Sequence, residues 1–338
     1  MRIDDVDVGW DASAWEVVHA DRALADDGLP RRAALTGVRP HWGALVERLP
    51  LAALDGLSFA NARLSADELL PLARRADAAS IRALRLPGNA IDRDGLHRLV
   101  ATPLFHGLEE LDLGDNPIGP AGLWLIAAAV PSLVRLALPE LGLDTTTTAA
   151  ALPRLRWLEL ARNPLGSAAL ERVLGDLEAP LEVLDLSLTQ LAVRPTRDLG
   201  SLRALGVGRN ALDGAAIARM IEPARDRVRW LDAGWTRAGD PLLSALAAIA
   251  PPALRTLAAE NAAITSAGAI ALSRAHLPAL AQLELANNQI DEAGARALSA
   301  WRGAPRLADC DLRGNPVPPA IAREIYMASP RVRFRAIE

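Results

Sequence analysis

LEELDLGDNPIG, residues 108–119, is the stretch that decides the fold of this chain. Leucine stands at its first, fourth and sixth positions, asparagine at its ninth and isoleucine at its eleventh. The frame returns with its asparagine from Ile81, Leu155, Leu202, Leu280 and Leu307, and more loosely from Leu54, Leu133, Leu181, Val228 and Leu254. These eleven copies, most of them 25 to 27 residues apart, predict a protein built from one repeated unit.

Most copies predict a short strand followed by a helix. In LEELDL, Leu111 and Leu113 face the core and Asp112 faces away, as the two-residue period of a strand requires. The segments SAGAIALSRA from Ser266 and DEAGARALSA from Asp291 begin with a capping residue and continue with helix formers. Because one such unit cannot cover its own apolar face, the units should stack into a right-handed α/β solenoid.

The repeats resemble the leucine-rich repeat family over residues 54–320, and the long copies are similar to its ribonuclease-inhibitor type. That resemblance implies a horseshoe, with a parallel sheet on the concave face and helices on the convex face. All 37 basic residues are arginine. A bacterial genome rich in GC would favour the Ala, Arg, Gly and Pro codons seen here, so we expect a bacterial source.

The ninth-position asparagines should be structural, because an inward amide can pair with backbone groups where the chain leaves the strand. They are Asn89, Asn116, Asn163, Asn210, Asn288 and Asn315. The copies with Ala62, Leu141, Thr189, Thr236 and Ala262 at this position should have a weaker ladder of such bonds. Asn61 and Asn261, one place early, are expected to compensate.

The copies that begin at Leu133 and Leu181 are only 22 and 21 residues long. Their connections, DTTTTAAALPR and AVRPTRDLGS, are too short or too rich in turn formers for a full helix. These two repeats should therefore lack one.

A solenoid needs both ends covered. We expect a helical N-terminal cap over residues 1–53, with helices in ASAWEVVHADRALADD and HWGALVERL. Residues 321–338 should form a C-terminal cap. The segment PPAIAREIYMASP, which begins just before it, predicts a last helix, and RVRFRAIE predicts a final strand. The three parts would make one continuous domain.

The composition points away from several classes of function. A net charge of −4 argues against nucleic acid and anionic membranes as partners. The five histidines show no metal-ligand spacing, and the single cysteine, Cys310, takes a core position. There is no phosphate-binding loop and no nucleophile elbow. We therefore expect no metal, no cofactor and no enzyme activity.

The concave face remains as the candidate site. Its central column, the fifth position, is acidic in six of eleven copies, and five second positions are arginine. Tryptophan occupies outward positions nearby, where aromatic side chains often anchor protein interfaces. The candidate partner-binding residues are Asp112, Trp157, Glu159, Asp185, Trp230, Asp232 and Trp235. Two other interpretations stay open: the acids pair with nearby arginines, or the tryptophans pack on arginine stems.

The sequence thus predicts a monomeric scaffold that binds a protein or peptide, with basic character, on its concave face. The alternatives are a regulator of an enzyme, such as a GTPase-activating protein, and a bacterial effector delivered into host cells. The first alternative follows from fold analogy alone. The N-terminus lacks a secretory pattern, and no apolar run is long enough to span a bilayer, so a cytoplasmic location is expected.

Overall fold

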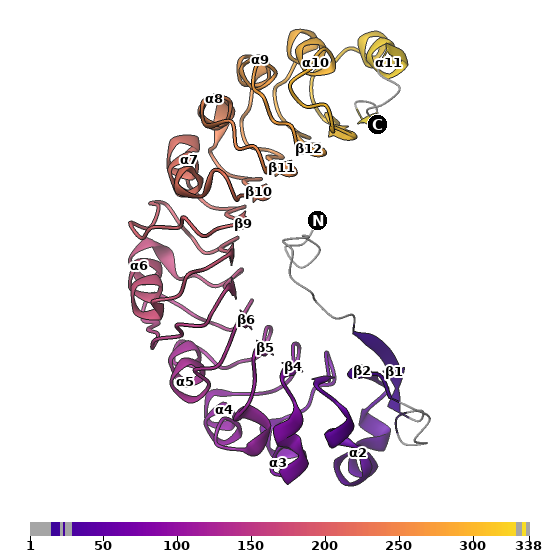
Figure 1. Cartoon of the computed structure of the whole chain (residues 1–338), viewed down its shortest axis with the longest axis vertical. Coiled ribbons are helices and arrows are strands. Elements are labelled where there is room, and N and C mark those ends of the chain that lie inside the picture. Colours follow the sequence, from indigo (N-terminus) through magenta and orange to yellow (C-terminus); the bar gives the residue numbers. More distant parts are fainter. Residues whose placement is uncertain (1–14, 21–22, 24–28, 329–332, 336–338) are drawn as a thin grey trace. The chain divides into compact units, whose positions relative to one another are not determined.

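The computed structural model describes residues 15–20, 23, 29–328 and 333–335. These residues divide into two compact units, with the boundary between Pro180 and Leu181. Within each unit, short strands form one side and helices lie on the other (Figure 1). We describe the two units separately.

The N-terminal unit contains a sheet of parallel strands. They are β1 (Glu16–His19), β2 (Arg32–Thr36), β3 (Gly56–Ser58), β4 (Ala83–Arg85), β5 (Glu110–Asp112), β6 (Arg135–Ala137) and β7 (Trp157–Glu159). Its helices are α2 (Trp42–Arg48), α3 (Ala66–Ala73), α4 (Arg93–Leu99), α5 (Gly122–Ala129) and α6 (Gly166–Leu177). The middle residue of each repeat strand is leucine, and Leu84, Leu111 and Leu136 pair in register inside the core.

The C-terminal unit continues the same pattern. Its parallel strands are β8 (Val183–Asp185), β9 (Ala204–Gly206), β10 (Trp230–Asp232), β11 (Thr256–Ala258), β12 (Gln282–Glu284), β13 (Asp309–Asp311) and β14 (Arg333–Arg335). Its helices are α7 (Gly214–Ile221), α8 (Gly239–Ile249), α9 (Ser266–Leu272), α10 (Glu292–Ser299) and α11 (Pro319–Ala328). Cys310 replaces the usual leucine in the middle of β13 and is buried, as its core position predicted.

The eighth position of every repeat has a left-handed backbone. Its φ angle is positive in all eleven copies, at Asn61, Gly88, Asp115, Glu140, Arg162, Leu188, Arg209, Trp235, Asn261, Asn287 and Gly314. This turn ends each strand and directs the chain toward the helix side. Because only glycine and, to a lesser degree, asparagine adopt it at low cost, the other side chains there strain the backbone.

The ninth-position asparagines join neighbouring repeats through buried hydrogen bonds. Nδ2 of Asn163 donates to the carbonyls of Leu138 and Leu160 at 2.8 and 3.0 Å. Its Oδ1 accepts from the backbone N–H groups of Leu141 and Leu143 at 3.1 and 3.0 Å. The other five asparagines make the same kind of bonds across the repeat boundary that precedes them. This ladder satisfies backbone groups that leave the strand.

Repeats without the asparagine are supported in a different way from the one we predicted. Asn61 and Asn261 occupy the eighth position, where the backbone is left-handed, and asparagine adopts this conformation at a low cost. The asparagine of the following repeat compensates instead, since Asn288 Oδ1 accepts from both Ala262 and Ile264 at 3.0 Å. In the repeat of Thr189, the threonine hydroxyl also donates to the Leu186 carbonyl at 2.7 Å.

The helix caps agree in part with the sequence. Asp291 caps α10, because its side chain accepts from the N–H groups of Ala293 and Gly294. At α9 the cap is Thr265, one residue before the serine that we expected. Ser266 donates instead to Asp291 at 2.6 Å and so joins the starts of two neighbouring helices.

The prediction of a helical N-terminal cap was wrong for part of residues 1–53. Residues Glu16–His19 and Arg32–Thr36 form strands β1 and β2, which extend the parallel sheet. A strand here lets backbone groups pair with the first repeat, which a helix cannot do. The expected helix over residues 41–49 is confirmed as α2. Much of residues 1–28 lies outside the described part.

The two short repeats lack a helix, as their connections predicted. No helix occurs between β6 and β7, and none between β8 and β9. At the C-terminal end, the expected last helix and final strand are found as α11 and β14.

Candidate functional site

In the N-terminal unit, the sheet face that carries no helices holds Trp157 and Glu159 on β7. We predicted that Trp157 is exposed, but this was wrong, because only 3 % of its surface is exposed. The guanidinium of Arg135, on the neighbouring strand, lies 4.1 Å from the ring centroid. Arg135 also pairs with Glu159 at 3.2 Å, and the Trp157 indole N–H donates to the same carboxylate.

The remaining charges on this face are largely paired within the unit. Arg32 on β2 reaches Glu110 on β5 at 2.9 Å, across the small residues Gly56 and Ala83. Oδ1 of Asp112 accepts a hydrogen bond from the Gly114 N–H at 3.0 Å. Here the contacts agree with the interpretations that the sequence left open, in which acids pair with nearby arginines and a tryptophan packs on an arginine.

In the C-terminal unit, the corresponding face carries a row of acids. We call the third residues of β8–β13 the acidic column; in register they are Asp185, Gly206, Asp232, Ala258, Glu284 and Asp311. Acids and small residues alternate from β8 to β12. Asp311 is neutralised by Arg313 at 2.8 Å. Asp232 and Glu284 form no ion pair with any described residue.

Asp232 has an unfavourable environment for a carboxylate. Burial raises its pKa from the ordinary value of 3.8 to about 6, and the carboxylates of Asp185 and Glu284 strengthen the rise. A hydrogen bond from the Gly234 N–H, at 2.8 Å, acts in the opposite direction. Among the described residues, no cation forms an ion pair with this carboxylate.

Two tryptophans flank this carboxylate differently. Trp230 lies two residues before Asp232 on β10 and, contrary to our prediction, is only 3 % exposed. Its indole Nε1–H has no hydrogen-bond acceptor among the described residues. Trp235 is 44 % exposed, and the guanidinium of Arg209 lies 4.6 Å from its ring centroid.

The structure thus separates the candidate residues into two sets. Trp157, Glu159 and Asp112 belong to the N-terminal unit, whereas Asp185, Trp230, Asp232 and Trp235 belong to the C-terminal unit. Sequence analysis missed a recurrent bond in which the fifth-position aspartate accepts from the N–H two residues later. It occurs at Asp112, Asp185, Asp232 and Asp311. An aspartate two residues before a glycine or serine was an available signal for three of these four bonds, at Asp112, Asp185 and Asp232.

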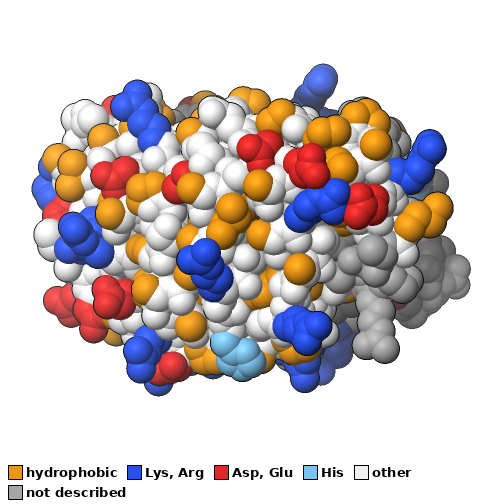
Figure 2. Space-filling model, turned by 90° about the horizontal axis from the view of Figure 1, so that it is seen from above, with side chains coloured by type: hydrophobic (Ala, Val, Ile, Leu, Met, Phe, Trp, Pro, Cys, Tyr) orange, Lys and Arg blue, Asp and Glu red, His pale blue; other side chains and the backbone are white. Residues whose placement is uncertain are grey.

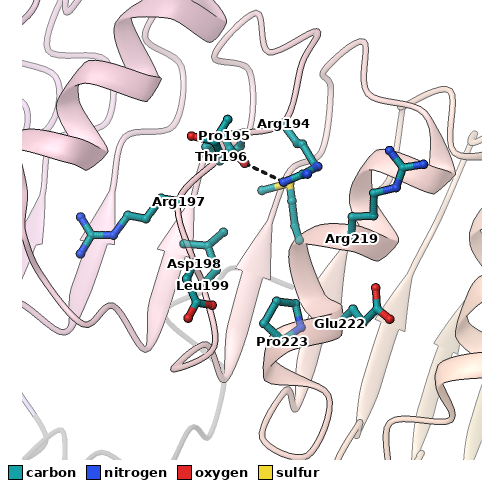
Figure 3. Close-up of a pocket in the computed structure, with 10 residues that line it drawn as sticks. Arg194, Pro195, Thr196, Arg197, Asp198, Leu199, Arg219, Glu222 and Pro223 are labelled. Atoms are coloured by element: carbon teal, nitrogen blue, oxygen red, sulfur yellow. Dashed lines mark hydrogen bonds between the residues drawn. The ribbon is translucent and has the colours of Figure 1, made fainter.

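The helix-less repeat at Leu181 leaves a pocket of about 610 Å³ beside α7. Arg194, Arg197 and Arg219 line it, but their side chains extend in different directions (Figure 3). The Arg194 guanidinium donates to the carbonyl of Pro195 at 3.1 Å. The pocket therefore presents no converging set of cations. On the face drawn in Figure 2, acidic and basic side chains are interspersed, unlike the acidic column.

Other kinds of site find little support in the described part of the chain. Its histidine, cysteine and acidic side chains form no group of three that could hold a metal ion. None of its helices combines the length and the hydrophobicity that crossing a bilayer requires. The helix-free face of the C-terminal unit is the strongest candidate that remains.

Comparison with known proteins supports the fold. Residues 108–127 match the family model described as Leucine Rich repeat. A chain in the structure of the Rad7 and Elc1 complex from yeast is similar at a TM-score of 0.57 and 14% sequence identity, covering 90% of this chain and 79% of that one. No curated protein sequence matches the chain.

Two further solved structures are similar at lower scores. An internalin (inlF) from Listeria monocytogenes has a TM-score of 0.47 and 16% identity, with 85% of this chain and 81% of that chain covered. The structure of the Arabidopsis receptor kinase HAESA, with the peptide hormone IDA and the co-receptor SERK1, gives 0.43 and 15%, with 84% and 49% covered. The matched repeat, its ten further copies and the observed strands and helices show that the chain has a leucine-rich repeat fold.

Proposed function

We propose that the protein is a scaffold that binds a protein or peptide partner of basic character on the helix-free face of its C-terminal unit. The observation that carries this proposal is the acidic column, in which Asp232 keeps a carboxylate that burial and two neighbouring acids disfavour. A cation from a partner would compensate this charge, and the described residues around it supply none.

Two features support a macromolecular partner. The column follows parallel strands, which are spaced about 4.8 Å apart, so it presents charges over a length that suits a chain better than a small molecule. Trp235 adds an exposed aromatic ring near the same strand, and such rings often anchor interfaces. The similar chain from yeast belongs to the structure of a complex of Rad7 and Elc1, which is consistent with a scaffold role for this fold.

Affinity capture with charge-matched variants tests the proposal. Asp232→Asn with Glu284→Gln removes two charges from the acidic column. Glu222→Gln with Asp226→Asn removes two exposed charges outside it and serves as the control. We expect the wild type and the control to retain a common set of proteins from a lysate, identified by mass spectrometry, that the column variant loses. If the three proteins retained the same set, the acidic column would not be the binding surface.

A further inference from the structure

Arginine recurs at the second position of the frame, just before the strand, and the proposed function makes no use of it. In the C-terminal unit, Arg203, Arg229 and Arg255 directly precede the adjacent strands β9, β10 and β11. The backbone N–H groups of Arg229 and Arg255 each donate to the carbonyl of the preceding arginine at 2.7 Å. The three backbones therefore lie side by side, about 4.8 Å apart, along one edge of the sheet.

In the N-terminal unit, arginine at this position has a structural role. The guanidinium of Arg82 donates to the carbonyl of Gly107 at 3.0 Å, and that of Arg156 donates to the carbonyl of Pro180 at 3.3 Å. Each of these arginines thus joins its repeat to the loop that leads into the next repeat. Arg229 differs, because its guanidinium forms no hydrogen bond or ion pair with any described residue. A role in joining repeats therefore does not account for Arg229.

Further arginines lie close to Arg229. Arg225 and Arg227 are exposed in the turn that precedes β10. Arg203 pairs with Glu182 at 3.0 Å, and Arg225 lies 3.7 Å from Asp226. Arg227, like Arg229, forms no ion pair with an acid in the described part of the chain. We call this group the basic edge; its members are Arg203, Arg225, Arg227, Arg229 and Arg255.

The surroundings of the basic edge favour an acidic protein segment over nucleic acid as its ligand. Arg229 lies three residues before Asp232, roughly 10 Å away along the strand. A nucleic acid strand carries a phosphate charge about every 3.4 Å, so it would approach this acid as well as the arginines, on a chain whose net charge is −4. A peptide carries its carboxylates on separate side chains and can place them at the arginines alone. Guanidinium groups also match carboxylates in geometry.

We propose that the basic edge binds a segment of a protein partner that is rich in aspartate and glutamate. Arg227 and Arg229 form ion pairs with carboxylates of the segment, and the other arginines of the edge add to the attraction. The basic edge is separate from the acidic column, so this inference goes beyond the proposed function and does not depend on it.

Two labelled peptides test the proposal by fluorescence anisotropy at low ionic strength. One is a short peptide in which glutamate alternates with glycine, and in the other glutamine replaces every glutamate. Binding is measured with the full chain as wild type and as two charge-matched double variants. Arg227→Gln with Arg229→Gln changes the basic edge, and Arg237→Gln with Arg323→Gln removes two exposed arginines outside it. Circular dichroism checks that each variant remains folded.

We expect the glutamate peptide to bind the wild type and the control variant at least about tenfold more tightly than it binds the edge variant. A ratio of this size is within reach of two ion pairs. The glutamine peptide should bind none of the three proteins. The affinity for the glutamate peptide should fall as salt is added, because salt screens charges at the surface.

Other results would overturn the proposal. If the glutamate peptide did not bind the wild type, or if the edge and control variants lost it equally, the basic edge would not be a specific site. If a labelled single-stranded oligothymidylate bound more tightly and needed the same two arginines, the edge would be a site for nucleic acid instead. Asp232→Asn with Glu284→Gln leaves the basic edge intact, so the proposed function and this inference can fail separately.

Discussion

Asp232→Asn should stabilise the folded protein at neutral pH. A tenfold change in proton affinity corresponds to about 1.4 kcal/mol, so the rise of the Asp232 pKa from 3.8 to about 6 amounts to about 3 kcal/mol at most. Water at the partly exposed carboxylate lowers this figure, and we expect a gain of about 1 to 3 kcal/mol. The asparagine keeps an oxygen that can accept from the Gly234 N–H.

The sign of the pH dependence follows from the direction of the shift. The folded-state pKa of Asp232 lies above its unfolded value, so the ionised group destabilises the fold above about pH 6 and ceases to do so below about pH 3.8. The advantage of Asp232→Asn over the wild type should therefore be largest at pH 7.5 and nearly absent at pH 3.5. Urea unfolding followed by circular dichroism at both pH values measures it.

Asp144→Asn provides a control of opposite sign. Hydrogen bonds from the side chain and backbone N–H of Thr146 lower the pKa of Asp144, so its charge stabilises the fold at neutral pH. The Asp144 variant should be less stable than the wild type at pH 7.5, with the difference disappearing at low pH. Our reasoning about Asp232 is refuted if its variant gains nothing at pH 7.5 or gains equally at both pH values.

Binding of a basic peptide should depend on the same ionisation. A cation favours the ionised form of Asp232, so the affinity should fall as the pH is lowered from 7 to 5. The carboxylates of Asp185 and Glu284, each two strands away from Asp232, raise its pKa and so keep this transition near pH 6. Affinity that stays constant over this range in fluorescence anisotropy would contradict a contact with Asp232.

Five further substitutions test the account of the fold, each by urea unfolding at neutral pH. Asn163→Ala leaves buried carbonyl and N–H groups without partners and should lower the free energy of unfolding by about 3 kcal/mol or more. Asn287→Gly, at an exposed left-handed position, should change it by less than about 1 kcal/mol. Equal effects of the two substitutions would disprove the stabilising role of the asparagine ladder. Gly214→Ala would place a methyl group 2.9 Å from the Cα of Leu242 on α8 and should lower the free energy of unfolding by about 2 kcal/mol. Gly175→Ala, with open space around it, should raise the free energy of unfolding by up to about 1 kcal/mol. An unchanged stability of the Gly214→Ala variant would mean that α7 and α8 are not closely packed. Trp235→Gly loses the contact with Arg209 but relieves the left-handed backbone, so the net change should stay within about 1 kcal/mol, and a larger loss would show that the ring supports the fold.

The sequence predicted the repeated strands and helices because their periods differ and the strand motif recurs eleven times. It also predicted the two helix-less repeats, since connection length and turn residues are local properties. The N-terminal strands were missed because a short apolar segment such as EVVH fits a strand or a helix, and only pairing with β2 decides between them.

The candidate site was harder to predict than the fold. Position in the frame gave the face on which Trp157 and Trp230 lie, but not what covers them. For Trp157 a signal existed, because Arg135 occupies the same position in the preceding repeat and so becomes its neighbour in register. The Trp230 indole N–H has no acceptor among the described residues, and the pKa of Asp232 is raised; both depend on burial, which a repeat pattern does not report.

The left-handed eighth position offers a route for engineering. Leu188 and Trp235 occupy a backbone region that bulky side chains adopt at a cost of about 1 kcal/mol or more, while glycine or asparagine fills it in five other repeats. Glycine at Leu188, an exposed residue, should therefore raise thermal stability without touching the acidic column. Because the angle recurs in every repeat, one rule could guide thermostable versions of this chain and consensus repeats derived from it.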